Sequence, residues 1–165
     1  MADMQDAGYA GRHALSTLVE RVNALVRTIA FPSLTQLALR LALAVPFWRS
    51  GINKWDGFLD LNEVAVLLFA QEFKLQLPGG PYGFPAPGIV AFLVGSAEIL
   101  LPLLLVVGLA TRLAALGLLA MTIVIQVTVP SGWPLHLTWA AMALAIMAWG
   151  PGKASADHLL ARFAR

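Results

Sequence analysis

The apolar positions near the start of the chain repeat with the period of a helix. Between residues 13 and 29 they recur three or four residues apart, and the charged residues fall largely on the other face. This pattern predicts an amphipathic helix that lies in the membrane interface. A Phe-Pro-Ser sequence at residues 31–33 is expected to end it. Residues 1–33 are therefore predicted to be a polar N-terminus and an interfacial helix.

Four longer apolar segments follow and predict four membrane spans, at about residues 34–53, 87–110, 112–130 and 135–149. A helix of 20 residues rises ~30 Å, the thickness of the hydrocarbon core. No Asp, Glu, Lys or Arg occurs between Arg112 and Lys153, and residues 130–134 divide that stretch in two. We therefore expect an all-α fold, a transmembrane four-helix bundle over residues 34–152, with a cytoplasmic tail at 153–165.

The connection between the first two spans has two parts. Residues 64–70 are apolar but too few to cross a membrane, so they predict a short surface or re-entrant helix in an outer loop. Residues 78–88 read PGGPYGFPAPG, in which neither a helix nor a strand is expected to propagate.

Composition agrees with a membrane location and excludes several other classes. The chain is 59% hydrophobic and 12% charged, too few polar side chains to cover a soluble domain, so much of its surface is expected to face lipid. It has no cysteine, which excludes disulfides, thiolate metal sites and CxxC chemistry within the chain. The net charge is +2 and the basic residues are scattered, so no nucleic-acid partner is expected.

The distribution of basic residues predicts the orientation in the membrane. With the N-terminus inside, the outer loops carry only Lys54 and Lys74. The inner side then carries Arg12, Arg21, Arg27, Arg112, Lys153, Arg162 and Arg165. Because cytoplasmic loops are enriched in basic residues, both termini are expected to be cytoplasmic.

Glu98 lies near the middle of the second span, where an unpaired carboxylate is costly. Arg40 is the expected partner and Arg49 the alternative, because Glu98 is expected to lie about 6 Å from either arginine along the membrane normal. Helical angles also place Arg40, Gly51 and Lys54 on one face. The pair has two interpretations: a buried ion pair that fixes helix register, or a site that handles a proton or a ligand.

A second group of side chains lies in the outer third of the predicted bundle. Arg49, Gln126, His136 and Trp139 fall at similar depth and offer hydrogen-bond donors, an aromatic face and apolar surroundings. Such a combination predicts a pocket for a quinone headgroup or another flat carbonyl compound. The alternative is that Arg49 and His136 reach toward the interface while Gln126 bonds a neighbouring helix.

No metal site is expected. The predicted topology places His136 outside and His13 and His158 inside, and no HxxxH or ExxH pair exists. The sequence also lacks a GxGxxG motif, a phosphate-binding loop and a GxSxG nucleophile elbow.

Three stretches taken in order resemble the DoxX family of small bacterial membrane proteins. They are LALRLALAVPFWRSGINKWDGF, GSAEILLPLLLVVGLATRLAALGLLAM and GPGKASADHLL, within about residues 34–160. One departure is Ala-Ser-Ala at residues 154–156, where larger apolar residues commonly flank the serine. The positions that match the family are Arg40, Gly51, Lys54, Glu98, Arg112 and Asp157.

The resemblance implies a four-helix membrane protein of the bacterial inner (plasma) membrane, whose relatives are linked to thiosulfate:quinone oxidoreduction, oxidative-stress complexes and operons for metal-binding peptides. The expected function is a redox-linked membrane subunit that binds or couples to quinone or quinol. The alternatives are a non-catalytic anchor or scaffold for a partner enzyme or biosynthetic complex, and a small-solute permease. Fold analogy does not choose among them or decide whether the chain is an enzyme.

The expected partners are the lipid bilayer and a redox or biosynthetic protein, with homo-oligomerisation left open. Quinone is the one candidate cofactor.

Overall fold

The computed structural model describes residues 17–164, which fall into two compact units, Met1–Thr35 and Gln36–Arg165. In the first unit, Thr17–Ile29 is a helix with every residue exposed, including the apolar ones. The predicted amphipathic helix is therefore present from residue 17. Its predicted first turn, at residues 13–16, lies outside the described residues, as do Arg12, His13 and Arg165.

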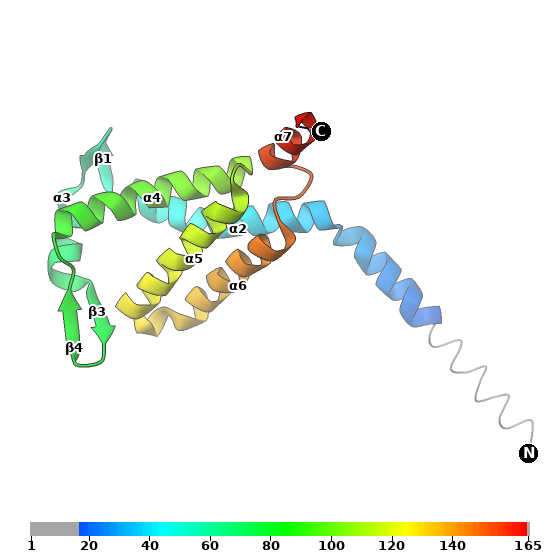
Figure 1. Ribbon diagram of the computed structural model, residues 1–165. Helices are drawn as coiled ribbons and strands as arrows, with labels where there is room; N and C mark the ends of the chain where they lie inside the picture. The colour runs from blue at the N-terminus through cyan, green and yellow to red at the C-terminus, as the bar shows by residue number, and fades with distance from the viewer. Residues whose placement is uncertain (1–16, 165) are drawn as a thin grey trace, which may run out of the picture. The chain divides into compact units, whose positions relative to one another are not determined.

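Four long helices build the second unit: α2 (Pro32–Ile52), α4 (Pro87–Val107), α5 (Thr111–Thr128) and α6 (Trp133–Trp149). Each contributes to one apolar core, in which Leu43, Leu105, Leu118 and Ile146 are almost fully buried. A 3₁₀ turn at Pro130–Gly132 joins α5 to α6, and these two helices run side by side (Figure 1). The predicted four apolar segments are thus four helices packed on a common core.

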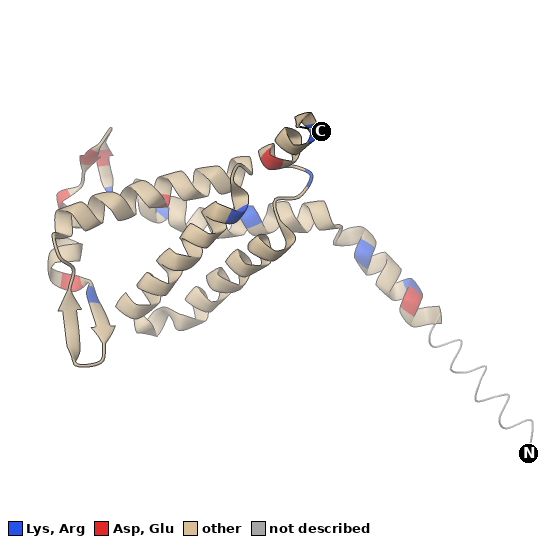
Figure 2. Cartoon of the chain, in the orientation of Figure 1, with Lys and Arg blue, Asp and Glu red and all other residues tan. Residues whose placement is uncertain are grey.

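Two of these helices are long and apolar enough to cross a membrane by themselves, α4 and α5. α2 passes the same test only together with Thr17–Ile29, as one broken span, and α6 has 17 residues. Charged residues are scarce along α4, α5 and α6 (Figure 2). The chain is a membrane protein by these features. The prediction of four spans is supported for α4 and α5, and it stays a prediction for α2 and α6.

The connection from α2 to α4 differs from the all-α prediction. It forms two antiparallel hairpins, β1 (Trp55–Gly57) with β2 (Asp60–Leu61), and β3 (Lys74–Leu77) with β4 (Gly80–Gly83). Between the hairpins lie α3 (Glu63–Leu67) and a π-helical turn (Leu68–Glu72), which confirm a short helix in this connection.

The expectation that residues 78–88 form no strand is wrong, because β4 lies within them. Leu77 pairs with Gly80, so Pro78 and Gly79 form a two-residue turn, in which Gly79 has φ +96°. Such a turn needs a residue that tolerates positive φ. Pro81 is accommodated because β4 is an edge strand, where a missing N–H breaks no second ladder. The proline and glycine residues thus form the hairpin that they were expected to prevent.

A last helix, α7 (Ala156–Phe163), follows α6 after residues 150–155. The Ser155 side chain accepts a hydrogen bond from the backbone N–H of His158, 3.1 Å, and so caps its first turn. The backbone N–H of Asp157 donates to the carbonyl of Gly108 at 2.9 Å. The predicted tail is therefore attached, at its start, to the turn between α4 and α5.

Candidate functional site

Gly51 brings the end of α2 into direct contact with the middle of α4. A Cβ atom on Gly51 would lie 2.9 Å from both the carbonyl carbon and the carbonyl oxygen of Glu98, closer than real Cβ contacts come. The absence of a side chain therefore allows the two helices to meet here. As a result, the Glu98 side chain extends beside the last turn of α2.

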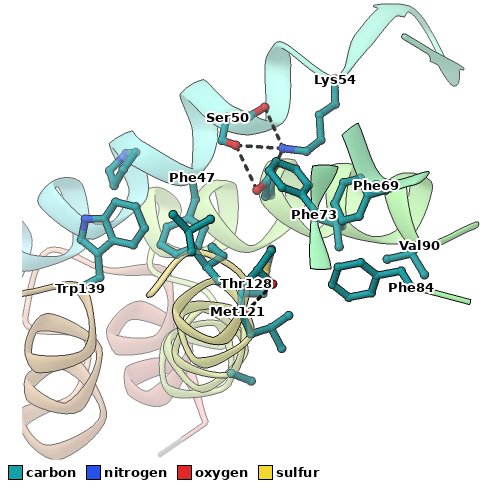
Figure 3. Close-up of a pocket in the computed structure, with 17 residues that line it drawn as sticks. Phe47, Ser50, Lys54, Phe69, Phe73, Phe84, Val90, Met121, Thr128 and Trp139 are labelled. Atoms are coloured by element: carbon teal, nitrogen blue, oxygen red, sulfur yellow. Dashed lines mark hydrogen bonds and ion pairs between the residues drawn. The ribbon is translucent and has the colours of Figure 1, made fainter. Parts of the chain in front are cut away.

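Glu98 is paired with Lys54 in a partly buried polar cluster that also contains Ser50 (Figure 3). Lys54 Nζ lies 2.5 Å from Glu98 Oε2 and donates to Ser50 Oγ at 2.9 Å. Ser50 Oγ donates to Glu98 Oε1 at 3.1 Å. Glu98 is 3% exposed, so its two oxygens are satisfied by these neighbours rather than by solvent.

The predicted pairing of Glu98 with Arg40 is wrong, and Arg49 does not replace it. Lys54 lies two residues beyond the end of α2, and its long side chain reaches back toward Ser50, one turn earlier. Arg40, Gly51 and Lys54 share one face, as the helical angles predict, but Lys54 is the residue of this face whose side chain pairs with Glu98.

A cavity of about 410 Å³ adjoins this cluster (Figure 3). Ser50, Lys54 and Glu98 supply the charged and most of the polar atoms of its lining, together with Thr128 from α5. The remaining lining is apolar and includes Pro46, Phe47, Phe69, Phe73, Phe84, Val90, Val94, Ala120, Met121, Val124, Ile125, Val129 and Trp139. The cavity therefore combines a large apolar surface with one polar wall.

Three phenylalanines from the connection between α2 and α4 form one side of this cavity. The Phe69 ring packs edge-on against Phe73 at 5.2 Å and against Phe84 at 5.6 Å between centroids. Phe69 belongs to the π-helical turn, a form of helix that often occurs at functional sites. The segment that we predicted as an outer loop is thus part of the site, and sequence reasoning missed these aromatic residues because it treated the connection as surface.

The predicted outer pocket is only partly formed. His136 Nδ1 lies 2.8 Å from Gln126 Oε1, and the His136 ring lies 5.2 Å from the Trp139 ring. Trp139 also lines the cavity and packs against Phe47 at 5.1 Å. Gln126, His136 and Trp139 therefore converge as expected, although Gln126 and His136 are not among the residues that line the cavity.

Arg49 does not join that group. It is exposed on α2 and lines a different groove, with Val45 and Trp48 from α2 and Pro102 from α4. The expectation that Arg49 joins the outer pocket is therefore wrong. Arg49 directly precedes Ser50, which lines the cavity, and at about 100° per residue the two side chains leave α2 in different directions.

A second cluster lies around the buried Arg40, in the first half of α2. The Arg40 side chain is 1% exposed, and its Nη2 donates to the carbonyl of Ala154. The Asp157 carboxylate accepts the backbone N–H groups of Ala110 at 2.8 Å and Thr111 at 2.9 Å, at the start of α5. Arg40 therefore acts on the segment that leads into α7, not on Glu98.

Hydrogen bonds and charge control the ionisation of Asp157. Burial by itself would raise the pKa of this carboxyl, but the backbone N–H groups of Thr111 and Ala110 and the positive charge of Arg40 outweigh it. The pKa of Asp157 therefore lies below its ordinary value, and the side chain is charged at neutral pH. A negative charge at the N-terminus of α5 also complements the helix dipole.

Five of the six family-matching positions fall into these two clusters. Lys54 and Glu98 belong to the polar wall of the cavity, Gly51 packs against the backbone of Glu98, and Arg40 and Asp157 form the junction with α7. The sixth, Arg112, is exposed. Within residues 17–164, no three His, Cys, Asp or Glu side chains come close enough to hold a metal ion.

Four apolar helices on one core, a buried ion pair and an aromatic cavity define a helical integral membrane protein with a ligand-sized site. A family model described as DoxX matches residues 35–131. Because this match covers more than half of the chain, the protein belongs to the DoxX family. The match includes Arg40, Gly51, Lys54, Glu98 and Arg112. It ends before α6 and α7. The chain matches no curated protein and no solved structure.

Proposed function

We propose that this DoxX-family protein is a redox-linked membrane subunit whose cavity binds the ring of a quinone or quinol. The observation that carries the proposal is the composition of the cavity wall. Its volume of about 410 Å³ lies within the range of small-molecule sites, and its lining is aromatic and apolar apart from one polar side. A quinone has the complementary pattern, a flat apolar ring with carbonyl oxygens at its edge.

The residues of the polar wall have distinct roles in this proposal. Lys54 Nζ has three N–H groups, and it donates to Glu98 Oε2, to Ser50 Oγ and, at 3.4 Å, to the Ser50 carbonyl oxygen. The last contact is the longest, so in this proposal a quinone carbonyl replaces the Ser50 carbonyl as acceptor, and Glu98 keeps the ammonium group oriented. Phe73 and Trp139 lie on the apolar sides, where they can pack against the ring.

Reduction of a quinone to a quinol takes two electrons and two protons. The chain has no cysteine to supply electrons, so in this proposal a partner redox protein provides them. Ser50, Lys54 and Glu98 form a hydrogen-bonded group beside the ring that can pass a proton toward it. We further propose four spans in a bacterial inner membrane with both termini cytoplasmic, on the distribution of basic residues.

The test is a quinone titration of the purified protein, followed by quenching of tryptophan fluorescence, because Trp139 lines the cavity. Lys54→Met is expected to weaken quinone binding about tenfold or more, as it removes a charged hydrogen-bond donor. Ala120→Phe places a ring in the cavity from α5 and is expected to abolish binding.

Lys74→Met is the matched control, because Lys74 is a lysine of the same connection that does not line the cavity. Its affinity should equal that of the unaltered protein. If Lys74→Met and Lys54→Met change the affinity for quinone equally, the proposal is contradicted. If the unaltered protein neither binds quinone nor co-purifies with it, but captures a partner protein tightly, the role of a membrane anchor or scaffold is the better account.

A further inference from the structure

A second groove lies between α2 and α4, on a face of α2 that does not line the cavity. Its volume is about 260 Å³, and its lining includes Val45, Trp48, Arg49, Pro102, Leu103 and Val106. Val45, Leu103 and Val106 are each roughly half exposed, and Trp48 is 39% exposed. Because these apolar side chains belong to the membrane domain, the groove opens toward lipid rather than toward the protein core.

Arg49 is the one charged residue of this groove. It is exposed, and no hydrogen bond or ion pair joins it to any residue of the described part of the chain. The other arginine of α2, Arg40, is buried and bonded to a carbonyl. A cation on the lipid-facing side of a membrane helix is costly unless it finds a counter-charge or water.

Arg49 lies close to the end of α2. It is three residues before Ile52, which corresponds to about 4.5 Å along the axis, so its long side chain can extend toward a lipid headgroup. The apolar lining extends away from that end, because Val45 is one turn earlier on α2 and Val106 lies late in α4. The groove thus has a cationic part near the end of α2 and an apolar part that runs back along the helix.

We propose that this groove binds a membrane glycerophospholipid, with Arg49 on its phosphate and one acyl chain along the apolar lining. A guanidinium group can bond two oxygens of a phosphate in a charge-assisted, bidentate contact. Trp48 suits the same depth, because tryptophan side chains favour the headgroup region. Free phosphate would satisfy Arg49 but leave the apolar part without a partner, so the phospholipid is the better fit.

The experiment compares two lipids on the delipidated, full-length protein by native mass spectrometry. Dioleoylphosphatidylglycerol carries the phosphate, and dioleoylglycerol has the same acyl chains without it. The unaltered protein is expected to retain the phospholipid about tenfold more strongly than dioleoylglycerol. Arg49→Gln should lose this preference, and Arg49→Lys should keep part of it. Val45→Trp, which fills the apolar part, should weaken the binding of both lipids.

Arg162→Gln is the control, because Arg162 is an exposed arginine of α7 outside the groove. It should retain the phospholipid as the unaltered protein does. Equal retention of the two lipids by the unaltered protein would overturn the proposal. This measurement uses the unaltered protein alone, so it does not depend on whether a variant folds. Competition by inorganic phosphate would assign the site to a free anion instead. A dimer that Val45→Trp converts to a monomer would assign the groove to a second copy of the chain.

Discussion

At the scale of single residues, glycine and charge decide how the site is built. Gly51 sets the distance between α2 and α4, and this distance lets Ser50 and Lys54 reach Glu98. Glu98 is buried and Lys54 is partly buried, so the carboxylate would be costly without the lysine. The polar wall of the cavity therefore forms because α2 and α4 meet closely at Gly51.

Gly51→Ala is expected to destabilise the protein by about 1–3 kcal/mol, the usual cost of forcing an extra carbon into a packed contact. The new Cβ would lie 2.9 Å from the Glu98 backbone, which cannot move without shifting α4. Thermal unfolding in detergent measures the change.

Gly88→Ala provides the comparison for Gly51→Ala, since its Cβ would lie 4.0 Å from Val66, an ordinary contact. Its unfolding temperature should remain close to that of the unaltered protein. Equal melting temperatures for the two variants would show that the close approach of α2 and α4 at Gly51 does not limit stability.

Asp157 makes stability depend on pH in the acid range. Its pKa is lowered in the folded protein, so its charged form contributes stability above its ordinary pKa of about 4. That contribution is lost as the pH falls through the folded-state pKa. Asp157→Asn should cost about 1 kcal/mol at neutral pH, where it removes the charge at the α5 N-terminus.

The measurement for Asp157→Asn is thermal unfolding as a function of pH. The difference between this variant and the unaltered protein should be constant near neutral pH and shrink as the pH falls below about 4. Asp60→Asn changes an exposed carboxylate of β2 and should show no comparable difference. A gap that persists unchanged in acid would mean that the contribution of Asp157 does not come from its charge.

At the scale of elements, the long helices were predictable and the connection was not. The spans predicted at 87–110 and 112–130 compare with α4 (Pro87–Val107) and α5 (Thr111–Thr128). Apolar runs bounded by proline and glycine fix such helices locally. The four strands depend instead on pairing between neighbouring segments, which a search for apolar periodicity does not detect.

The same distinction applies to the candidate site. The depth of a residue follows from counting along a helix, so the grouping of Gln126, His136 and Trp139 was predictable. The direction of a side chain depends on the rotation and packing of its helix, so Arg49 was assigned to a pocket that it does not line. The contribution of Phe69 and its neighbours to the cavity depends on how the connection folds back on the helices, which no local pattern encodes.

At the scale of the whole molecule, the orientation in the membrane remains a prediction that labelling can test. The chain has no cysteine, so single cysteines can be introduced directly. Cysteines at Asp60 and Ser131 are expected to react with a membrane-impermeant reagent in intact cells, and one at Ala161 only after the membrane is opened. All three positions are exposed. Labelling at Ala161 in intact cells would reverse the proposed orientation.

The junction between Arg40 and the segment before α7 has a consequence for biosynthesis. The bond from Arg40 to Ala154 joins residues 114 positions apart, and Asp157 follows Thr111 by 46. A ribosome therefore synthesises α2, α4, α5 and α6 before the tail that neutralises Arg40 and caps α5. During translation, that arginine and those amide groups depend on water or lipid headgroups. The helices can enter the bilayer one after another, but the native junction closes only after residue 157 has left the ribosome.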